Sequence, residues 1–307
     1  MAERKRVVVR VPASTANLGP GFDALGLALG LYNEIEVELG GQGLQLTIEG
    51  EGAERLQSLG AQNLVARAVT GTLHRFGVRP DGFRLRMLNR IPLSRGLGSS
   101  SAAALGGVAA AATVAGMALD PEELLDLALP LEGHPDNIAP ALLGGLTVAT
   151  VVEGRVRCVK LPVPAELQAV AVIPDFRLST AKARQALPPT VPRSDVVFNV
   201  GRVALFLAAM QTGRMDLLRE AARDRLHQPY RAPLVPGMME VLAEGERAGA
   251  LACFLSGAGP TLLALVGGEG AQVGSRMAAA WKARTGVEAR VCPLPIDRDG
   301  LVVLESL

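Results

Sequence analysis

Apolar and polar residues alternate along two stretches near the start of the chain. Residues 31–39 alternate between apolar and polar positions, most clearly at Ile35, Val37 and Leu39, which is typical of a half-buried strand. A glycine-rich turn at residues 40–43 leads into a second such stretch at 44–48. The two stretches and the turn between them predict a β-hairpin.

Other periodic segments extend this pattern over the first half of the chain. A β-branched run at residues 7–11 ends at Pro12, so we expect a strand there and a polar, glycine-rich loop over 13–23. Helical spacing of apolar residues predicts a helix over 64–76, and renewed alternation predicts a strand over 83–89.

Residues 102–119 carry no charge and are mainly alanine and glycine. Their number is about that needed to span a membrane, but few of them are strongly apolar. We therefore expect a tightly packed, buried helix. A helix with acidic residues in its first turn is predicted over 121–131, followed by a polar loop at 132–137 and a strand over 146–152.

The chain changes character at the proline-rich residues 161–164, which we interpret as a domain boundary between residues 1–160 and 161–307. Strands and helices mingle without strict βαβ alternation, and this favours an α+β fold over a doubly wound parallel sheet. In the second half, strands are predicted over 168–173, 250–255, 261–266 and 288–292, and helices over 196–210, 215–226, 236–248 and 277–285.

Composition is that of an ordinary globular protein, and it narrows the range of partners. The chain has 307 residues, of which 49% are hydrophobic, and its net charge is +1. It has no basic block or acidic tail, so we expect neither nucleic acid nor a membrane as a partner. The three widely spaced cysteines indicate free thiols in a reducing compartment. The charged residues 1–6 lack the apolar stretch of a secretory signal, so we expect a cytoplasmic protein.

The segment from Ile91 to Ala103 carries the strongest functional signal. A strand that ends in proline runs into Gly96 and Gly98, then three serines, then an alanine-rich helix. Glycines let the backbone approach a ligand, and the first N–H groups of a helix favour phosphate. The three serines, at 99–101, are expected to cap the helix and to offer hydroxyls. The loop is not a Walker A sequence. A plain helix cap is the alternative interpretation.

Three further loops, at residues 12–23, 132–137 and 256–261, are more polar or glycine-rich than turning the chain requires. Together with residues 92–102 they resemble the motifs of the GHMP kinases, a family of small-molecule kinases for galactose, homoserine, mevalonate and phosphomevalonate. The Pro-x-x-x-Gly-Leu-Gly-Ser-Ser pattern matches the family's phosphate loop with one extra serine. The Ser-Gly-Ala-Gly-Pro-Thr segment matches its C-terminal motif.

Within the family, residues 17–23, 133–140 and 227–231 are most similar to the members that phosphorylate L-homoserine. The resemblance implies an N-terminal domain like domain 2 of ribosomal protein S5, a ferredoxin-like C-terminal domain, and an active site between them. It implies transfer of the γ-phosphoryl group of MgATP to the side-chain hydroxyl of L-homoserine, an early step of threonine biosynthesis. It also implies a homodimer.

The resemblance assigns ATP to the phosphate loop and Mg²⁺ to two oxygen ligands. Ser100 is expected to contact the metal through its hydroxyl, and Glu132 is expected to supply the second oxygen. Considered alone, Glu132 would be a surface carboxylate at a helix end. The residues expected to bind ATP are Pro92, Leu93, Ser94, Arg95, Gly96, Leu97, Gly98, Ser99, Ser100, Ser101 and Ala102.

L-homoserine is a zwitterion, so its site needs an acceptor for the ammonium group and donors for the carboxylate. Asn17 and Asp23 suit the amino end of the substrate. Arg184 and Arg231 suit the carboxylate, because a guanidinium group pairs with it through two hydrogen bonds. Outside the family's motifs, each arginine would be interpreted as a solvated surface charge.

Asp136 and Asn137 are expected beside the reacting hydroxyl. Related kinases use an aspartate in this loop as a base together with an N-terminal lysine, and residues 14–15 here are serine and threonine. We therefore favour direct transfer without a strong base, with Asn137 orienting the hydroxyl. His134 is expected to shape the loop, and Asn63 to reach the adenine.

Two alternatives remain open at the level of sequence. The chain could phosphorylate another small hydroxylated molecule, although the paired arginines disfavour a neutral sugar. A ligand sensor of the same fold without catalysis is the other alternative, and the intact phosphate loop and Glu132 disfavour it.

Overall fold

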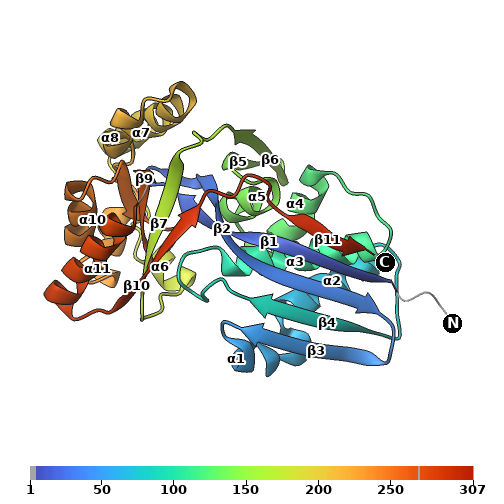
Figure 1. Cartoon of the computed structure of the whole chain (residues 1–307). Coiled ribbons are helices and arrows are strands. Elements are labelled where there is room, and N and C mark those ends of the chain that lie inside the picture. Colours follow the sequence, from blue (N-terminus) through green and yellow to red (C-terminus); the bar gives the residue numbers. More distant parts are fainter. Residues whose placement is uncertain (1–4, 269, 307) are drawn as a thin grey trace.

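The structure, a computed structural model, describes residues 5–268 and 270–306 and contains two β-sheets with helices packed against them. This confirms the α+β expectation (Figure 1). Within the described residues, the first sheet has seven strands in the order β11-β1-β2-β4-β3, with β5 paired to β2 and β6 paired to β5. Its strands are β1 (Arg6–Asn17), β2 (Gly21–Leu39), β3 (Gly43–Gly50), β4 (Gly82–Asn89), β5 (Leu146–Val152), β6 (Arg155–Leu161) and β11 (Val302–Ser306).

The predicted hairpin between residues 31–39 and 44–48 is wrong, because β4 lies between β2 and β3. It runs antiparallel to β2 and parallel to β3. The glycine-rich turn bends around the start of β4, where Gly40 N–H and Gly43 N–H donate to the carbonyls of Gly82 and Asp81, each at 2.9 Å. Alternation of apolar residues indicates which face of a strand is buried, but it does not indicate which strand lies alongside.

The expectation of a loop over residues 13–23 is also wrong. Strand β1 continues to Asn17 and β2 begins at Gly21, so a tight turn replaces most of the expected loop. Ser14 and Thr15 are fully buried in β1. Their polarity reflects partners in distant segments: Ser14 Oγ donates to Asn137 Oδ1 at 3.0 Å, and Thr15 Oγ1 accepts from Ser256 Oγ at 2.8 Å.

Helices cover one face of the first sheet. The uncharged segment begins within α3 (Ser99–Val114), and most of this helix is buried. Among the described residues, no helix is long and apolar enough to cross a membrane. The remaining helices of this part of the chain are α1 (Ala53–Gln57), the 3₁₀ turn η1 (Gly60–Gln62), α2 (Leu64–Arg75), α4 (Pro121–Glu132) and α5 (Pro135–Leu143).

Two glycines allow α3 to pack this closely. A Cβ atom at Gly106 would lie 2.5 Å from Ile35 Cδ1 of the sheet. A Cβ atom at Gly107 would lie 2.8 Å from Ala68 Cβ of α2. Helix α3 therefore lies tightly between the sheet and α2, and its N-terminus is fixed in position.

The second sheet is antiparallel, with the order β10-β7-β9-β8, which is the order expected of a ferredoxin-like domain. Its core includes the fully buried Trp281, whose Nε1 donates to the Pro236 carbonyl at 2.7 Å. The strands are β7 (Leu167–Pro174), β8 (Ala252–Leu255), β9 (Leu262–Gly267) and β10 (Ala289–Pro295), and α10 (Met238–Arg247) and α11 (Ala271–Thr285) pack on them.

The helix predicted over 215–226 is much shorter than expected. Asp224 explains this, because its carboxylate accepts the backbone N–H groups of Leu226, His227 and Gln228 at 2.7–3.0 Å. A side chain that binds the backbone in this way competes with the helix. The elements of this region are α6 (Thr180–Gln185), α7 (Arg193–Thr212), η2 (Met215–Leu217), α8 (Leu218–Ala221), α9 (Gln228–Arg231) and η3 (Ala232–Leu234).

The chain passes from the first sheet to the second between β6 and β7, near the predicted boundary. It then returns, because β11 pairs with β1. The division into domains of residues 1–160 and 161–307 stays a proposal. It assigns β11 to the second domain, although this strand pairs with the first sheet. Residues 1–4, which belong to the charged start, lie outside the described residues.

The same substitution at two glycines should have opposite effects on stability. Gly71→Ala on α2 meets no atom within 4 Å. It should stabilise the fold by up to about 1 kcal/mol, because alanine is the better helix former. Gly107→Ala should destabilise it by about 1–3 kcal/mol through overpacking against α2. Urea denaturation measures both, and equal effects would contradict the packing described for α3.

Candidate active site

A cavity of about 560 Å³ lies where the four distinctive loops meet. It is lined by all the predicted substrate residues and by Glu132, Asp136 and Asn137. The phosphate loop lines it from Pro92 to Ser101. Ala102 is the exception, because it is fully buried and its N–H already donates to the Gly98 carbonyl at 2.9 Å. The structure therefore brings the predicted site together, but it does not place Ala102 in contact with a ligand.

The two glycines of the phosphate loop are required by its geometry. Gly96 and Gly98 have φ values of +74° and +68°. A Cβ atom at Gly96 would lie 2.2 Å from the Ser256 carbonyl oxygen, and one at Gly98 would lie 2.2 Å from Ser14 Oγ. No larger residue fits at either position without moving neighbouring chain segments.

The expected serine cap of α3 is absent. The N-cap is Gly98, and no side chain caps the helix. Ser100 Oγ donates to Glu132 instead, and Ser101 is fully buried. The first N–H groups of α3 therefore have no capping side chain, which favours an anion site over a plain helix cap.

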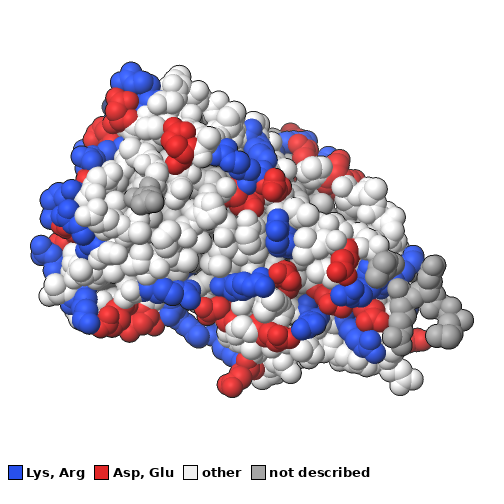
Figure 2. Space-filling model, viewed as in Figure 1, with Lys and Arg blue, Asp and Glu red and all other residues white. Residues whose placement is uncertain are grey.

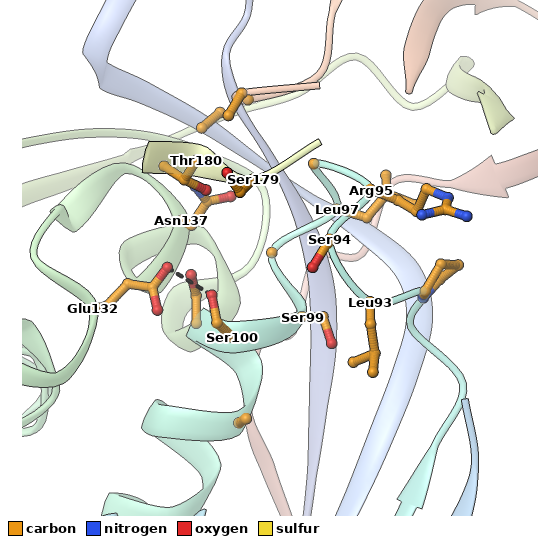
Figure 3. A pocket seen from close by; sticks show the side chains of 18 of the residues that line it. Leu93, Ser94, Arg95, Leu97, Ser99, Ser100, Glu132, Asn137, Ser179 and Thr180 are labelled. Carbon is orange, nitrogen blue, oxygen red and sulfur yellow. Dashed lines mark hydrogen bonds between the residues drawn. The ribbon is translucent and has the colours of Figure 1, made fainter. Parts of the chain in front are cut away.

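Ser100 and Glu132 meet at the start of α3. Ser100 Oγ donates to Glu132 Oε1 at 2.9 Å, as Figure 3 shows. Burial raises the pKa of the Glu132 carboxyl, and the hydrogen bond from Ser100 partly opposes this shift. Two oxygen-bearing side chains beside an anion cradle fit a magnesium ion that takes its other ligands from phosphate and water.

Asp23 and Arg184 form an ion pair on the cavity wall. The Arg184 guanidinium donates to the two oxygens of the Asp23 carboxylate at 2.7 and 3.1 Å. Arg231 lies deeper, with only 1% of its surface exposed, and donates to the Gly257 carbonyl at 3.1 Å. Burial, followed by the nearby charge of Arg184, lowers the pKa of Arg231 to about 10. The wall therefore offers two cations and one anion to a small ligand.

Asn17 connects the two halves of the site. Its Nδ2 donates to the Gly257 carbonyl at 3.0 Å, and its Oδ1 accepts the Asp23 N–H at 3.0 Å. The side chain thus fixes the backbone that presents Asp23, and Oδ1 keeps a second lone pair for a ligand.

Asp136 and Asn137 lie at the first turn of α5. Asp136 is 3% exposed, and burial, assisted by the charge of Asp23, raises its pKa to about 7. Its Oδ1 has no hydrogen-bond partner among the described residues. Asn137 accepts the Ser14 hydroxyl through Oδ1, so its amide NH₂ group is the part left to contact a ligand.

Two expected side-chain roles do not fit the structure. Arg95 was expected to bind ATP, but its side chain points out of the cavity (Figure 3) and donates to the carbonyls of Pro174 and Asp175 at 2.9 and 2.8 Å. Asn63 was expected to reach the adenine. Its side chain is buried and occupied, because Oδ1 caps α2 and Nδ2 donates to the Leu56 carbonyl.

Several residues that line or fix the cavity belong to motifs noted in the sequence, but sequence reasoning assigned them no role. Ser179 and Thr180, at the start of α6, line it opposite the phosphate loop. Ser256 joins three segments, with its hydroxyl within 2.6 Å of the Gly96 carbonyl and 2.8 Å of Thr15 Oγ1. A serine directly after a buried strand and before a glycine turn was the available signal for Ser256.

Comparison with known proteins agrees with this geometry. The family model for the GHMP kinases N terminal domain matches residues 63–145, and that for the GHMP kinases C terminal domain matches residues 206–283. The chain belongs to the GHMP kinase family. As a GHMP kinase it is a phosphotransferase, and the family implies ATP as its phosphoryl donor.

The similar proteins include homoserine kinases. That of Moorella thermoacetica is 47% identical over 97% of this chain and 99% of its own length. That of Carboxydothermus hydrogenoformans is 48% identical over 87% of each chain. The crystal structure of homoserine kinase from Cytophaga hutchinsonii has a TM-score of 0.87 and 28% identity over 99% of each chain.

The raised pKa of Asp136 predicts a pH-dependent cost to the GHMP kinase fold. Burial raises this pKa from an ordinary 3.8 to about 7, so the folded chain holds the proton more tightly than the unfolded chain. Stability from this group is therefore greatest below about pH 4 and falls as pH rises through about 7. Asp136→Asn should remove the decline and be more stable than the parent at pH 8 by about 2–4 kcal/mol.

Urea denaturation at pH 4.5 and 8 of the parent, Asp136→Asn and the exposed-site control Asp81→Asn checks this effect. A pH profile of Asp136→Asn that parallels the parent's would contradict it.

Proposed function

We propose that this GHMP kinase is a homoserine kinase, which transfers the γ-phosphoryl group of ATP to the side-chain hydroxyl of L-homoserine. One observation carries the proposal: a single cavity joins an uncapped helix N-terminus to a wall with Arg184, Arg231 and Asp23. The first feature suits a polyphosphate. The second suits a small molecule that has both a carboxylate and an ammonium group. The homoserine kinases similar to this chain support the same choice.

The phosphate side of the site is rigid. Backbone N–H groups of the loop between Gly96 and Ser101 hold the triphosphate, and the contacts of Gly96 and Gly98 with neighbouring segments fix the loop before ATP arrives. Phosphoryl transfer needs such positioning and charge neutralisation more than covalent help. Ser100 and Glu132 hold Mg²⁺, which neutralises charge on the phosphates when it is bound.

The amino-acid side of the site matches the charges of L-homoserine. Arg231 binds the substrate carboxylate, because its hydrogen-bond partners among the described residues are neutral and its buried charge gains from a directly paired anion. Arg184 assists it while remaining paired with Asp23, whose carboxylate accepts the substrate ammonium together with Asn17 Oδ1.

The reacting hydroxyl lies beside Asn137 and Asp136 in this proposal. The amide NH₂ group of Asn137 orients the hydroxyl toward the phosphate loop. Ser14 occupies Asn137 Oδ1, so the amide cannot rotate freely. Direct transfer requires no strong base: the substrate oxygen bonds to the γ-phosphorus as the bond from that phosphorus to the ADP oxygen breaks, and the hydroxyl proton passes to an oxygen of the transferred phosphoryl group.

A coupled assay of ADP release tests the function. With Mg²⁺ and ATP, turnover should require L-homoserine, and L-serine, L-threonine, mevalonate and galactose should be poor acceptors. Arg231→Ala should lower kcat/KM for L-homoserine about 30–1,000-fold, because it removes one partner of a buried charged pair. The matched control, Arg225→Ala, removes an exposed arginine paired with Asp195 and should change kcat/KM less than threefold.

Strong turnover with another acceptor would support a kinase activity but would reject L-homoserine as its substrate. No turnover with any acceptor, together with tight ATP binding, would indicate a ligand sensor.

We place the enzyme in the cytoplasm, where its three free thiols stay reduced, with no nucleic acid or membrane as a partner. Charges of both signs are interspersed on the face that Figure 2 shows, which supports this view.

A second copy of the chain is its protein partner. The face offered for the homodimer is on α7, where Val196, Val197 and Val200 are all more than 40% exposed.

The homodimer can be tested by light scattering after size-exclusion chromatography. The parent should have about twice the chain mass of 32.0 kDa. Val197→Glu should shift it to monomer, because a charge would be buried at the interface. Val159→Glu, at a similarly exposed valine on β6, should leave the dimer intact. A monomeric parent would reject the homodimer, and a dimeric Val197→Glu would reject the α7 face.

A further inference from the structure

The ring of Phe22 lies among the cations of the substrate wall. The guanidinium carbon of Arg184 is 5.5 Å from the centre of the ring, and that of Arg231 is 5.3 Å from it. Both distances are within the range of cation–π attraction. Phe22 directly precedes Asp23 at the start of β2, so the residue that supplies the site's anion follows the ring in sequence.

Two guanidinium groups this close repel each other. The charge of Arg184 contributes to the lowered pKa of Arg231. Asp23 pairs with Arg184, but no ion pair joins Arg231 to a carboxylate among the described residues. The hydrogen-bond partners of Arg231 are neutral: the carbonyls of Ala183 and Gly257, and the ring of His227. The carboxylates of Asp23, Asp224 and Asp136 act on Arg231 without pairing with it directly. The face of the Phe22 ring adds negative potential beside its guanidinium group.

His227 completes this arrangement from below the surface. It is fully buried, and its ring stacks on Phe22 with centroids 5.3 Å apart and planes at 27°. Its Nε2 lies 2.8 Å from the Gly19 carbonyl, which only accepts, and its Nδ1 lies 3.2 Å from an Arg231 nitrogen, which only donates. The proton must therefore be on Nε2, and neutral Nδ1 accepts from Arg231.

We propose that Phe22 is a positioning residue for the carboxylate of the substrate. Its ring holds the guanidinium groups of Arg184 and Arg231 side by side, and His227 fixes the direction of Arg231. This inference rests on the proposed function for the identity of the substrate. The placement of the two arginines around the ring does not depend on that function.

The competing explanation is that Phe22 only fills space. Two substitutions separate the explanations, because Phe22→Leu keeps an apolar side chain and removes the ring, whereas Phe22→Tyr keeps the ring. Phe198 supplies a matched control: its ring also lies under two arginines, Arg202 and Arg225, at 4.4 and 4.0 Å, but neither of these arginines lines the cavity.

Steady-state kinetics test the positioning role. Phe22→Leu should raise KM for L-homoserine about tenfold, equivalent to about 1.4 kcal/mol of binding, and should change kcat and KM for ATP less than threefold. Phe22→Tyr should restore most of the affinity, and Phe198→Leu should leave it unchanged. With 3-aminopropan-1-ol, which lacks the carboxylate, Phe22→Leu and the parent should have equal kcat/KM.

Several outcomes would overturn the inference. These are an unchanged KM in Phe22→Leu, an equal loss in Phe198→Leu, a Tyr variant as weak as the Leu variant, or a loss that persists with 3-aminopropan-1-ol. Thermal unfolding of each variant identifies a general loss of folding.

A spectroscopic measurement keeps the inference testable even if the parent does not phosphorylate L-homoserine. The arginine Nε–H signals of the free protein can be assigned with Arg184→Lys and Arg231→Lys. The ring should shift both signals, so Phe22→Leu should move both and Phe22→Tyr should retain them. Signals that stay in place in Phe22→Leu would reject the role of the ring, whereas absent turnover in the parent would reject only the proposed function.

Discussion

The active site depends on one buried contact between the two sheets. The Ser256 hydroxyl, at the turn between β8 and β9, meets both the Gly96 carbonyl of the phosphate loop and Thr15 of β1. Beside it, Gly257 N–H donates to the Ala16 carbonyl, and the Gly257 carbonyl accepts from Asn17 and Arg231. The turn of the second sheet thus fixes the phosphate loop, strand β1 with Asn17, and the deeper arginine with one set of short contacts.

Two buried ionisable groups, Arg231 and Asp136, lie in the site that this junction positions. Burial lowers the pKa of Arg231 to about 10 and raises the pKa of Asp136 to about 7. Both groups cost stability in the empty protein, because a buried charge or an unpaired carboxyl is unfavourable. A ligand that brings a carboxylate to Arg231 and a hydroxyl near Asp136 offsets part of this loss of stability. The site is therefore organised for its ligands rather than for the stability of the free chain.

Much of this could be predicted from sequence, and the failures have physical causes. The resemblance to the GHMP kinases grouped the phosphate loop, Glu132 and both arginines, and the structure places them around one cavity. Considered one by one, Glu132 and the arginines would be interpreted as surface charges. The prediction of a hairpin was wrong because β4, which is distant in sequence, lies between β2 and β3. The contacts of the Arg95 side chain could not be predicted for a related reason. Its partners, the carbonyls at and just after the end of β7, become neighbours only once the second sheet has packed. The role of Ser256 was likewise visible only in three dimensions.

The return of β11 to the first sheet has a consequence for how the chain acquires its fold during synthesis. Strand β1 lies between β2 and β11, so a strand made early acquires its outer neighbour from a strand that is made only after the second sheet. Until then its outer edge presents unpaired backbone groups, which are a template for pairing with other chains. The second sheet is complete earlier, and its packing brings β11 back to β1. Completion of the first sheet therefore waits until all the strands of the second sheet have been made.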